Sequence, residues 1–222
     1  MTLGALCELM AQVALPPGLF WSAGQAEVDP AALFPDEAQA IARAIPKRQA
    51  DFTGGRKAAR AALAEMSLDP VPIPVAPTRA PVFPDGVVGS ISHDCGLCIA
   101  LVGYSDLWQS VGIDIAPDLP LEADLIAEIC RPEERTGVDP KNLPRHARRL
   151  FSVKEAVYKA QFMQTGVIFG FQGLCVSYPK NVARFATIAE TDPIPPQIKS
   201  RPLPFVQRCD HGLTLSISAI PA

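Results

Sequence analysis

Two segments in the middle of the chain contain polar side chains that could carry chemistry. Residues 89–94 read Gly-Ser-Ile-Ser-His-Asp, in which Ser92 and His93 can donate hydrogen bonds to a phosphate. Residues 111–116 read Val-Gly-Ile-Asp-Ile-Ala, an apolar strand that contains Asp114. A buried lone carboxylate is costly unless it is paired or bound to a metal ion. The structural alternatives are a hydrogen-bonded turn histidine and an aspartate paired with a lysine or a backbone amide.

A third segment, residues 151–159, reads Phe-Ser-Val-Lys-Glu-Ala-Val-Tyr-Lys. In a helix, separations of three and four residues place Ser152, Glu155 and Lys159 on one face. The alternatives to a functional face are an ordinary Glu–Lys pair on a solvated helix and a Ser-x-x-Glu capping box. A cap is less favoured because the apolar pattern of the helix starts well before Ser152.

Other common motifs are absent from the sequence. Cys95-x-x-Cys98 near His93 lacks the second ligand pair that zinc sites normally have, so buried thiols are the better interpretation. No G-x-S-x-G segment supports a serine nucleophile. Neither G-x-x-x-x-G-K-[ST] nor G-x-G-x-x-G occurs, which disfavours the common nucleotide-binding folds.

Composition restricts the class of protein. The 222 residues are 48% hydrophobic and 19% charged, which is typical of a globular chain. The net charge of -3 disfavours a nucleic-acid binder. No apolar stretch is long enough to span a membrane, and we expect the N-terminal segment to be an amphipathic helix rather than a signal peptide. Six scattered cysteines predict reduced thiols, and we expect a cytoplasmic monomer.

Periodicity predicts the elements that must position these residues. The region 36–65 is expected to form two helices because Pro46 and the pair Gly54–Gly55 interrupt it. The six prolines of residues 69–84 predict an extended surface loop. The other expected helices are 3–15, 121–130 and 144–163; the expected strands are 87–93, 97–103, 111–116, 174–178, 182–188 and 213–220.

These elements predict an α+β protein with mostly antiparallel sheets packed with helices. A set of helices and strands before residue 116 is followed by a second set after it. The order therefore indicates two similar halves, residues 1–116 and 117–222.

Taken together, the three segments resemble the 4′-phosphopantetheinyl transferase superfamily. The resemblance is carried by Ser-His, then Gly-Ile-Asp, then Phe-Ser-x-Lys-Glu-Ala-x-x-Lys, in this order. It extends to Arg56-Lys57-Ala58-Ala59-Arg60 and to the stretch that begins at Arg79. It covers residues 30–175 and is closest to the long, two-lobed group that includes the enterobactin-synthase component and surfactin-type enzymes.

The resemblance implies a pseudo-dimer of the two halves, with coenzyme A in the cleft between them. It implies an enzyme that moves the phosphopantetheine arm of coenzyme A to a serine of an acyl or peptidyl carrier protein. Magnesium is implied as cofactor, 3′,5′-ADP as the second product, and siderophore or polyketide synthesis as the setting. It further implies Asp114 and Glu155 as metal ligands, which act in catalysis with Lys159. Coenzyme A would be bound by the side chains of Arg56, Arg60, Arg79, Ser92, His93, Lys154 and Lys159.

One position departs from the family pattern. Many relatives have Asp-x-Glu in the strand, whereas this chain has Ala116 two residues after Asp114. One possible metal ligand is therefore missing, and Glu133 or Glu134 could replace it. We expect an active enzyme with a weaker metal site that contains more water.

Three further hypotheses follow from the sequence. The basic cluster Arg145, His146, Arg148 and Arg149 is either a solvated helix face or a docking site for an acidic carrier. Because of Ala116, the chain could be a catalytically weak relative that binds coenzyme A or a carrier without efficient transfer. An adaptor that binds partners through its proline-rich segment is the alternative outside the enzyme class.

Overall fold

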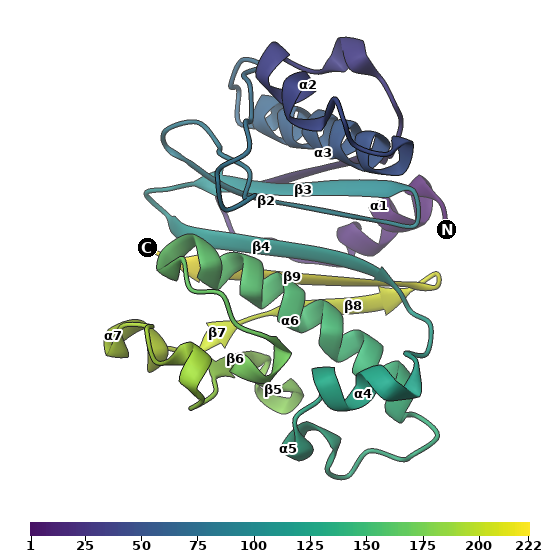
Figure 1. Cartoon of the computed structure of the whole chain (residues 1–222), viewed down its shortest axis with the longest axis vertical. Helices are drawn as coiled ribbons and strands as arrows, with labels where there is room; N and C mark the ends of the chain where they lie inside the picture. Colours follow the sequence, from purple (N-terminus) through teal and green to yellow (C-terminus); the bar gives the residue numbers. More distant parts are fainter.

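The computed structural model describes residues 1–222 and contains three antiparallel sheets of three strands each (Figure 1). The first has the order β1-β3-β2, the second β4-β9-β8 and the third β5-β6-β7. The strands are β1 (Leu19–Gln25), β2 (Val87–Asp94), β3 (Leu97–Tyr104), β4 (Trp108–Pro117), β5 (Leu174–Ser177), β6 (Val182–Phe185), β7 (Leu203–Pro204), β8 (Val206–Asp210) and β9 (Leu213–Pro221).

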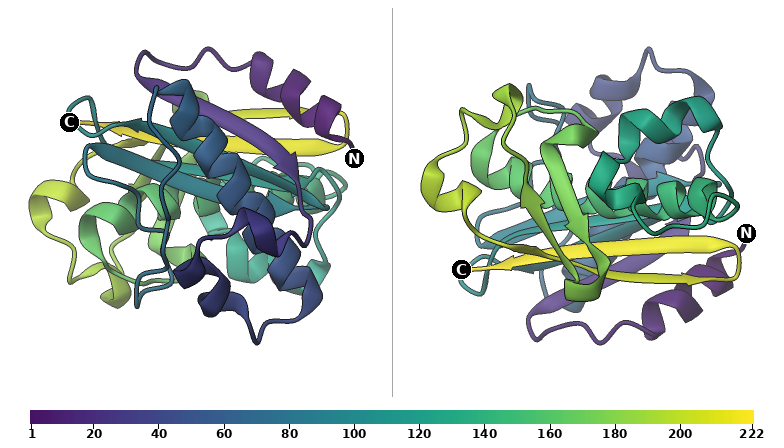
Figure 2. Two further views of the ribbon diagram at one scale, coloured as in Figure 1. Left: turned by 90° about the horizontal axis from the view of Figure 1, so that it is seen from above. Right: turned by 90° about the horizontal axis from the view of Figure 1, so that it is seen from below.

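Two long helices cover the two sheets with the longer strands. Helix α3 packs on the first sheet and helix α6 on the second (Figure 1). The N-terminal α1 packs on the opposite face of the second sheet (Figure 2). None of the helices is long and apolar enough to cross a membrane. The α-helices are α1 (Leu3–Ala11), α2 (Pro35–Ile41), α3 (Pro46–Glu65), α4 (Ala123–Ile129), α5 (Pro132–Arg135), α6 (Leu143–Thr165) and α7 (Pro196–Lys199); the 3-10 helices are η1 (Pro30–Ala32), η2 (Phe171–Gly173), η3 (Tyr178–Lys180) and η4 (Ala189–Thr191).

The two lobes meet where β2 lies beside β4, and serine side chains join these strands. The backbone N–H groups of Ile113 and Ile115 donate to Ser90 Oγ and Ser92 Oγ, each at 3.1 Å. The hydroxyls thus accept the hydrogen bonds that backbone carbonyls accept in a regular ladder. The α+β prediction with two lobes is confirmed. The strand β4, at the end of the predicted first half, pairs with β9 in the second sheet.

Most predicted elements are present, and the exceptions have packing reasons. The region 36–65 breaks only before Pro46, whereas Gly54 and Gly55 lie inside α3. A Cβ on Gly54 would lie 2.6 Å from Gln25 O, and one on Gly55 would lie 2.9 Å from the Ile91 side chain. The glycines therefore let α3 approach the first sheet closely. The sequence pattern does not predict strands β1, β7 and β8.

Gly112 allows a comparable close approach between β4 and α6. A Cβ at this position would lie 1.9 Å from Ala156 O and 2.8 Å from Ala160 N, both backbone atoms of α6. Helix backbone cannot rotate away as a flexible side chain can. The absence of a side chain at residue 112 therefore brings the face of α6 that carries Glu155 and Lys159 close to β4.

Gly112→Ala should consequently displace α6 and destabilise the protein. We expect a loss at or above the upper end of the usual overpacking cost of about 1–3 kcal/mol, measured as a lower melting temperature by circular dichroism. Gly24→Ala is the control, because nothing lies within 4 Å of its added Cβ. Equal melting temperatures for the two variants would contradict the close approach.

Candidate active site

The centre of the site is an acidic side chain held from two sides. Asp114 on β4 accepts hydrogen bonds at Oδ1 from Ser92 Oγ, at 3.1 Å, and from Lys159 Nζ, at 2.8 Å. Lys159 also donates to Ile113 O. The second oxygen, Asp114 Oδ2, is buried and has no hydrogen-bond partner. An unpartnered buried carboxylate oxygen is costly, so this atom is a candidate ligand for a cation.

Glu155 on α6 provides a second carboxylate near Asp114. No basic group lies within ion-pair distance of its oxygens. Burial raises the pKa of Glu155, and the nearby negative charge of Asp114 adds to the increase, while Lys159 opposes it. No cluster of three or more Asp, Glu, His or Cys side chains could hold a metal ion. The protein therefore offers two hard oxygen ligands here, and water or substrate would have to supply the others.

A cationic pocket lies beside α3, near the place where the two lobes meet. Arg56 is 6% exposed, donates from Nε to Ile73 O at 2.7 Å and lies over the Phe52 ring. Burial lowers the pKa of the Arg56 guanidinium to about 10, so it stays charged near neutral pH. Side chains from α3, the proline-rich loop and β2 converge here: the charged or titratable lining residues are Arg48, Asp51, Arg56, Arg79 and His93.

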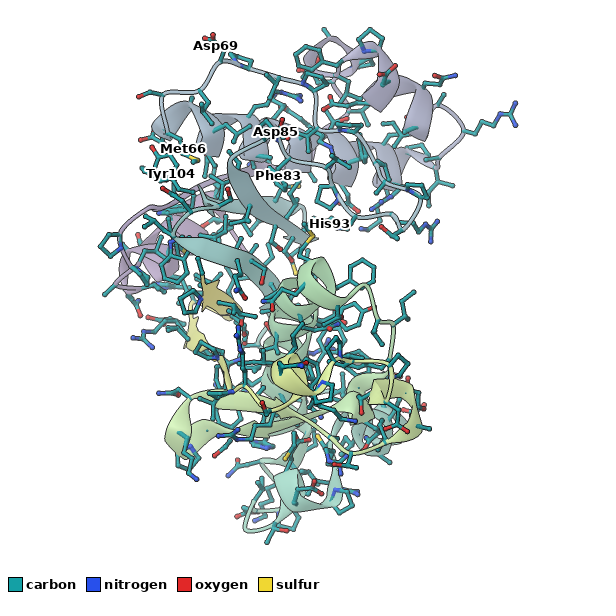
Figure 3. The ribbon with its side chains drawn as sticks, turned by 90° about the vertical axis from the view of Figure 1, so that its left-hand side faces the viewer. Met66, Asp69, Phe83, Asp85, His93 and Tyr104 are labelled. Atoms are coloured by element: carbon teal, nitrogen blue, oxygen red, sulfur yellow. The ribbon has the colours of Figure 1, made fainter.

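A longer groove continues from this pocket towards α6. One wall comes from the loop and β2, including Arg79, Pro81 and Ile91, which also line the cationic pocket. Phe83 holds this loop against β2, because its ring occupies the space that a Cβ on Gly89 would need (Figure 3). The other wall consists of α6 residues and Ile168, namely Tyr158, Lys159, Phe162, Met163 and Ile168. The groove can therefore accept an elongated ligand with an anionic end.

Comparison with known proteins identifies the family. The N-terminal domain of 4′-phosphopantetheinyl transferases matches residues 36–103, and the 4′-phosphopantetheinyl transferase superfamily matches residues 110–203. The 4′-phosphopantetheinyl transferase PptT of Mycobacterium tuberculosis is 38% identical over 185 residues, which are 80% of this chain and 79% of PptT. The chain belongs to the 4′-phosphopantetheinyl transferase superfamily. The resemblance inferred from its motifs is thus confirmed.

Other known proteins match over shorter stretches. The transferase Svp of Streptomyces mobaraensis is 41% identical over 143 residues, 63% of this chain and 58% of Svp. Enterobactin synthase component D of Salmonella typhi is 36% identical over 118 residues, 51% of this chain and 48% of that protein. The two family matches meet between residues 103 and 110, at the β3–β4 turn.

The structure corrects the role expected for Lys154. This side chain is 1% exposed, and its ammonium donates to Ile129 O, Glu134 Oε2 and Phe171 O at 2.7, 2.7 and 3.0 Å. All three of its N–H groups are therefore used inside the second lobe, and none is left for a phosphate. Burial lowers the pKa of Lys154, and Glu134 counteracts this.

Other residues that the sequence assigned to the site have partners inside the protein. Glu134 is committed to Lys154, so it does not replace the carboxylate missing at Ala116; Glu133 is paired with Arg131. Ser92 is buried, and its hydroxyl donates to Asp114, not to a phosphate. Arg60 is held by both oxygens of Glu37, at 2.8 and 3.0 Å, and by Ala32 O.

Arg48 is a pocket residue that sequence reasoning missed. It lies eight residues before Arg56 on α3, and both side chains reach the cationic pocket. A spacing of seven or eight residues places side chains on one helix face, so this signal was available in the sequence.

The basic cluster near the start of α6 is mostly engaged within the protein. Arg149 forms a bidentate pair with Asp118 at 2.8 and 2.7 Å. His146 Nε2 contacts Glu134 O at 3.0 Å, and Arg148 Nε donates to a backbone carbonyl at 3.3 Å. Arg149 therefore has a structural role, and Arg145 is the exposed residue of the cluster on which the docking hypothesis now depends.

Proposed function

We propose that this chain transfers the 4′-phosphopantetheine arm of coenzyme A to a serine of an acyl or peptidyl carrier protein. The serine Oγ attacks the β-phosphorus and loses its proton to solvent, the bond from that phosphorus to the bridging oxygen breaks, and 3′,5′-ADP leaves with that oxygen. The observation that carries this proposal is the unpartnered Asp114 Oδ2 near Glu155 and Lys159, because Lys159 contacts Asp114 and also lines the groove that begins in the cationic pocket.

The pocket and groove suggest how coenzyme A is oriented. The guanidinium groups of Arg48, Arg56 and Arg79 would bind the 3′-phosphate together with His93, because charge-assisted hydrogen bonds favour an anion there. The pantetheine arm would lie along the groove against α6. Lys159 uses two of its N–H groups on Ile113 O and Asp114 Oδ1, which leaves one for a pyrophosphate oxygen.

Asp114 and Glu155 fit a magnesium ion, which prefers carboxylate oxygens and keeps several waters. Asp114 Oδ2 and the Glu155 carboxylate would hold it. When bound, the ion would neutralise charge on the pyrophosphate and so ease the departure of 3′,5′-ADP. The protein contributes the position of the ligands, because Ser92 and Lys159 occupy Oδ1 and leave Oδ2 free.

Incubation with coenzyme A, Mg²⁺ and a panel of apo-carrier proteins, read by intact mass, tests the function. We expect at least one siderophore-type or polyketide-type carrier to gain the phosphopantetheine mass. Coenzyme A binding without any modified carrier would favour the alternative that this chain is a catalytically weak relative. The adaptor alternative has lost support, because the proline-rich segment lines both cavities through Arg79 and Pro81.

Ala116→Glu should strengthen metal binding. The register of β4 with β9 is regular from Ser110 to Pro117, so side chains 114 and 116 point to the same face. Calorimetry with Mg²⁺ should give a tighter complex, and half-maximal activity should need less Mg²⁺. Ala116→Gln, similar in size but uncharged, is the control. A metal titration of Ala116→Glu that overlays the wild type would place residue 116 outside the metal shell.

A further inference from the structure

One carboxylate lines the otherwise cationic pocket, and the proposed reaction assigns it no role. Asp51 on α3 is 5% exposed. Its Oδ2 lies 2.7 Å from Lys47 Nζ and 3.5 Å from His93 Nδ1. A negative charge repels a phosphate, so Asp51 would weaken phosphate binding in this pocket unless it also acts on a neighbouring side chain in a way that favours binding.

The two ring nitrogens of His93 face groups of opposite character. Nδ1 faces the Asp51 carboxylate, which can only accept, and Nε2 lies 3.2 Å from a terminal nitrogen of Arg48, which can only donate. A neutral ring with its proton on Nδ1 satisfies both neighbours. Figure 3 shows His93 at the end of β2.

A phosphate in the pocket changes what Nε2 must do. Phosphate oxygens accept hydrogen bonds, so an unprotonated Nε2 would face another acceptor. The ring cannot solve this by moving its proton from Nδ1 to Nε2, because Nδ1 would then face Asp51 without a hydrogen. A ring that carries protons on both nitrogens satisfies Asp51 and the phosphate together.

We propose that Asp51 is a positioning residue that keeps the Nδ1 proton of His93 in place, so that binding of the 3′-phosphate adds a solvent proton at Nε2. This inference rests on the proposed function only for the identity of the phosphate. The imidazolium then lies between a carboxylate and a phosphate, and binding is coupled to proton uptake.

The charges around His93 give the direction of the pH dependence. In the free protein, burial lowers the pKa of His93; Asp51 raises it, and the nearby cations lower it. A bound phosphate adds negative charge and raises this pKa. The extra affinity is therefore fully present below the free-state pKa and is lost as pH rises through the bound-state pKa. The charged groups facing His93 are Lys47, Arg48 and Asp51 on α3, Lys159 on α6, and Arg56 and Arg79 around the pocket.

Calorimetry of 3′,5′-ADP binding in PIPES and in Tris, buffers of low and high ionisation enthalpy, tests the proton uptake. At about pH 7.5 we expect the wild type to take up a fraction of a proton and His93→Gln to take up none. Adenosine 5′-phosphate, which lacks the 3′-phosphate, should show no uptake. A His93 pKa displaced by one unit on binding corresponds to about a tenfold change in affinity.

Asp51→Asn tests the positioning role. The titration of the His93 ring C–H resonance, assigned by its loss in His93→Gln, should show a smaller rise in pKa upon 3′,5′-ADP binding. Glu65→Gln, an exposed acid at the end of the same helix, should behave as the wild type. A merely structural Asp51 would change affinity or stability but leave the His93 titration shift intact.

The outcomes separate this inference from the proposed function. Binding of 3′,5′-ADP without proton uptake in the wild type overturns the inference and leaves the transferase proposal intact. An undiminished His93 shift in Asp51→Asn overturns the role of Asp51. Failure of both coenzyme A and 3′,5′-ADP to bind would overturn the two proposals together.

Discussion

Replacing Glu155 by glutamine should abolish transfer and leave the protein at least as stable as the wild type. Glu155 is a carboxylate without a basic partner, and burial raises its pKa. An acid with a raised folded-state pKa destabilises the fold once pH exceeds its unfolded pKa, so at neutral pH its ionised form opposes folding. Glutamine removes this penalty together with the proposed metal ligand. We expect a rate loss on the order of 10²-fold or more.

The measurement combines carrier modification by intact mass with thermal unfolding. Asp114→Asn should lose transfer to a similar extent. In this variant Ser92 and Lys159 would donate to a neutral amide oxygen instead of a carboxylate. Glu128→Gln, on the exposed surface of α4, is the control that should retain both activity and stability. Near wild-type turnover in Glu155→Gln would show that its carboxylate is not a ligand.

The two lysines that flank Glu155 should respond to substitution in opposite ways. Lys154 and its partner Glu134 are each 1% exposed, at 2.7 Å. Breaking a buried pair by removing one member typically costs about 3–5 kcal/mol, because the remaining charge is uncompensated. Lys154→Met should therefore strongly lower the free energy of unfolding in urea. Coenzyme A affinity should be unchanged at a temperature where the variant is folded.

Lys159→Met should show the reverse pattern. Its side chain is 27% exposed and contacts Asp114, so we expect a smaller loss of stability than in Lys154→Met and a large loss of transfer. The double variant Lys154→Met/Glu134→Gln should recover part of the stability lost in Lys154→Met. If Lys154→Met instead kept full stability and bound coenzyme A weakly, the lysine would return to the phosphate site.

Local patterns in the sequence were sufficient to predict the family and the two strands of the β2–β3 hairpin. They also predicted the position of Pro144 near the start of α6. They also indicated the face of α6 with Glu155 and Lys159, because a spacing of four is set by helix geometry alone. The side chains of Asp114 and Lys159, 45 residues apart, do meet.

Only the tertiary structure decided which neighbour each of these side chains has. Ser152 shares the predicted face but is buried against Ser216, with their hydroxyl oxygens 2.9 Å apart. Lys154 contacts Glu134 because α5 packs near α6. Strand β4 belongs to the second sheet because it pairs with β9. Helical and strand periodicity orient a side chain relative to its own element. The partner on the facing element depends on long-range packing, which residue spacing does not encode.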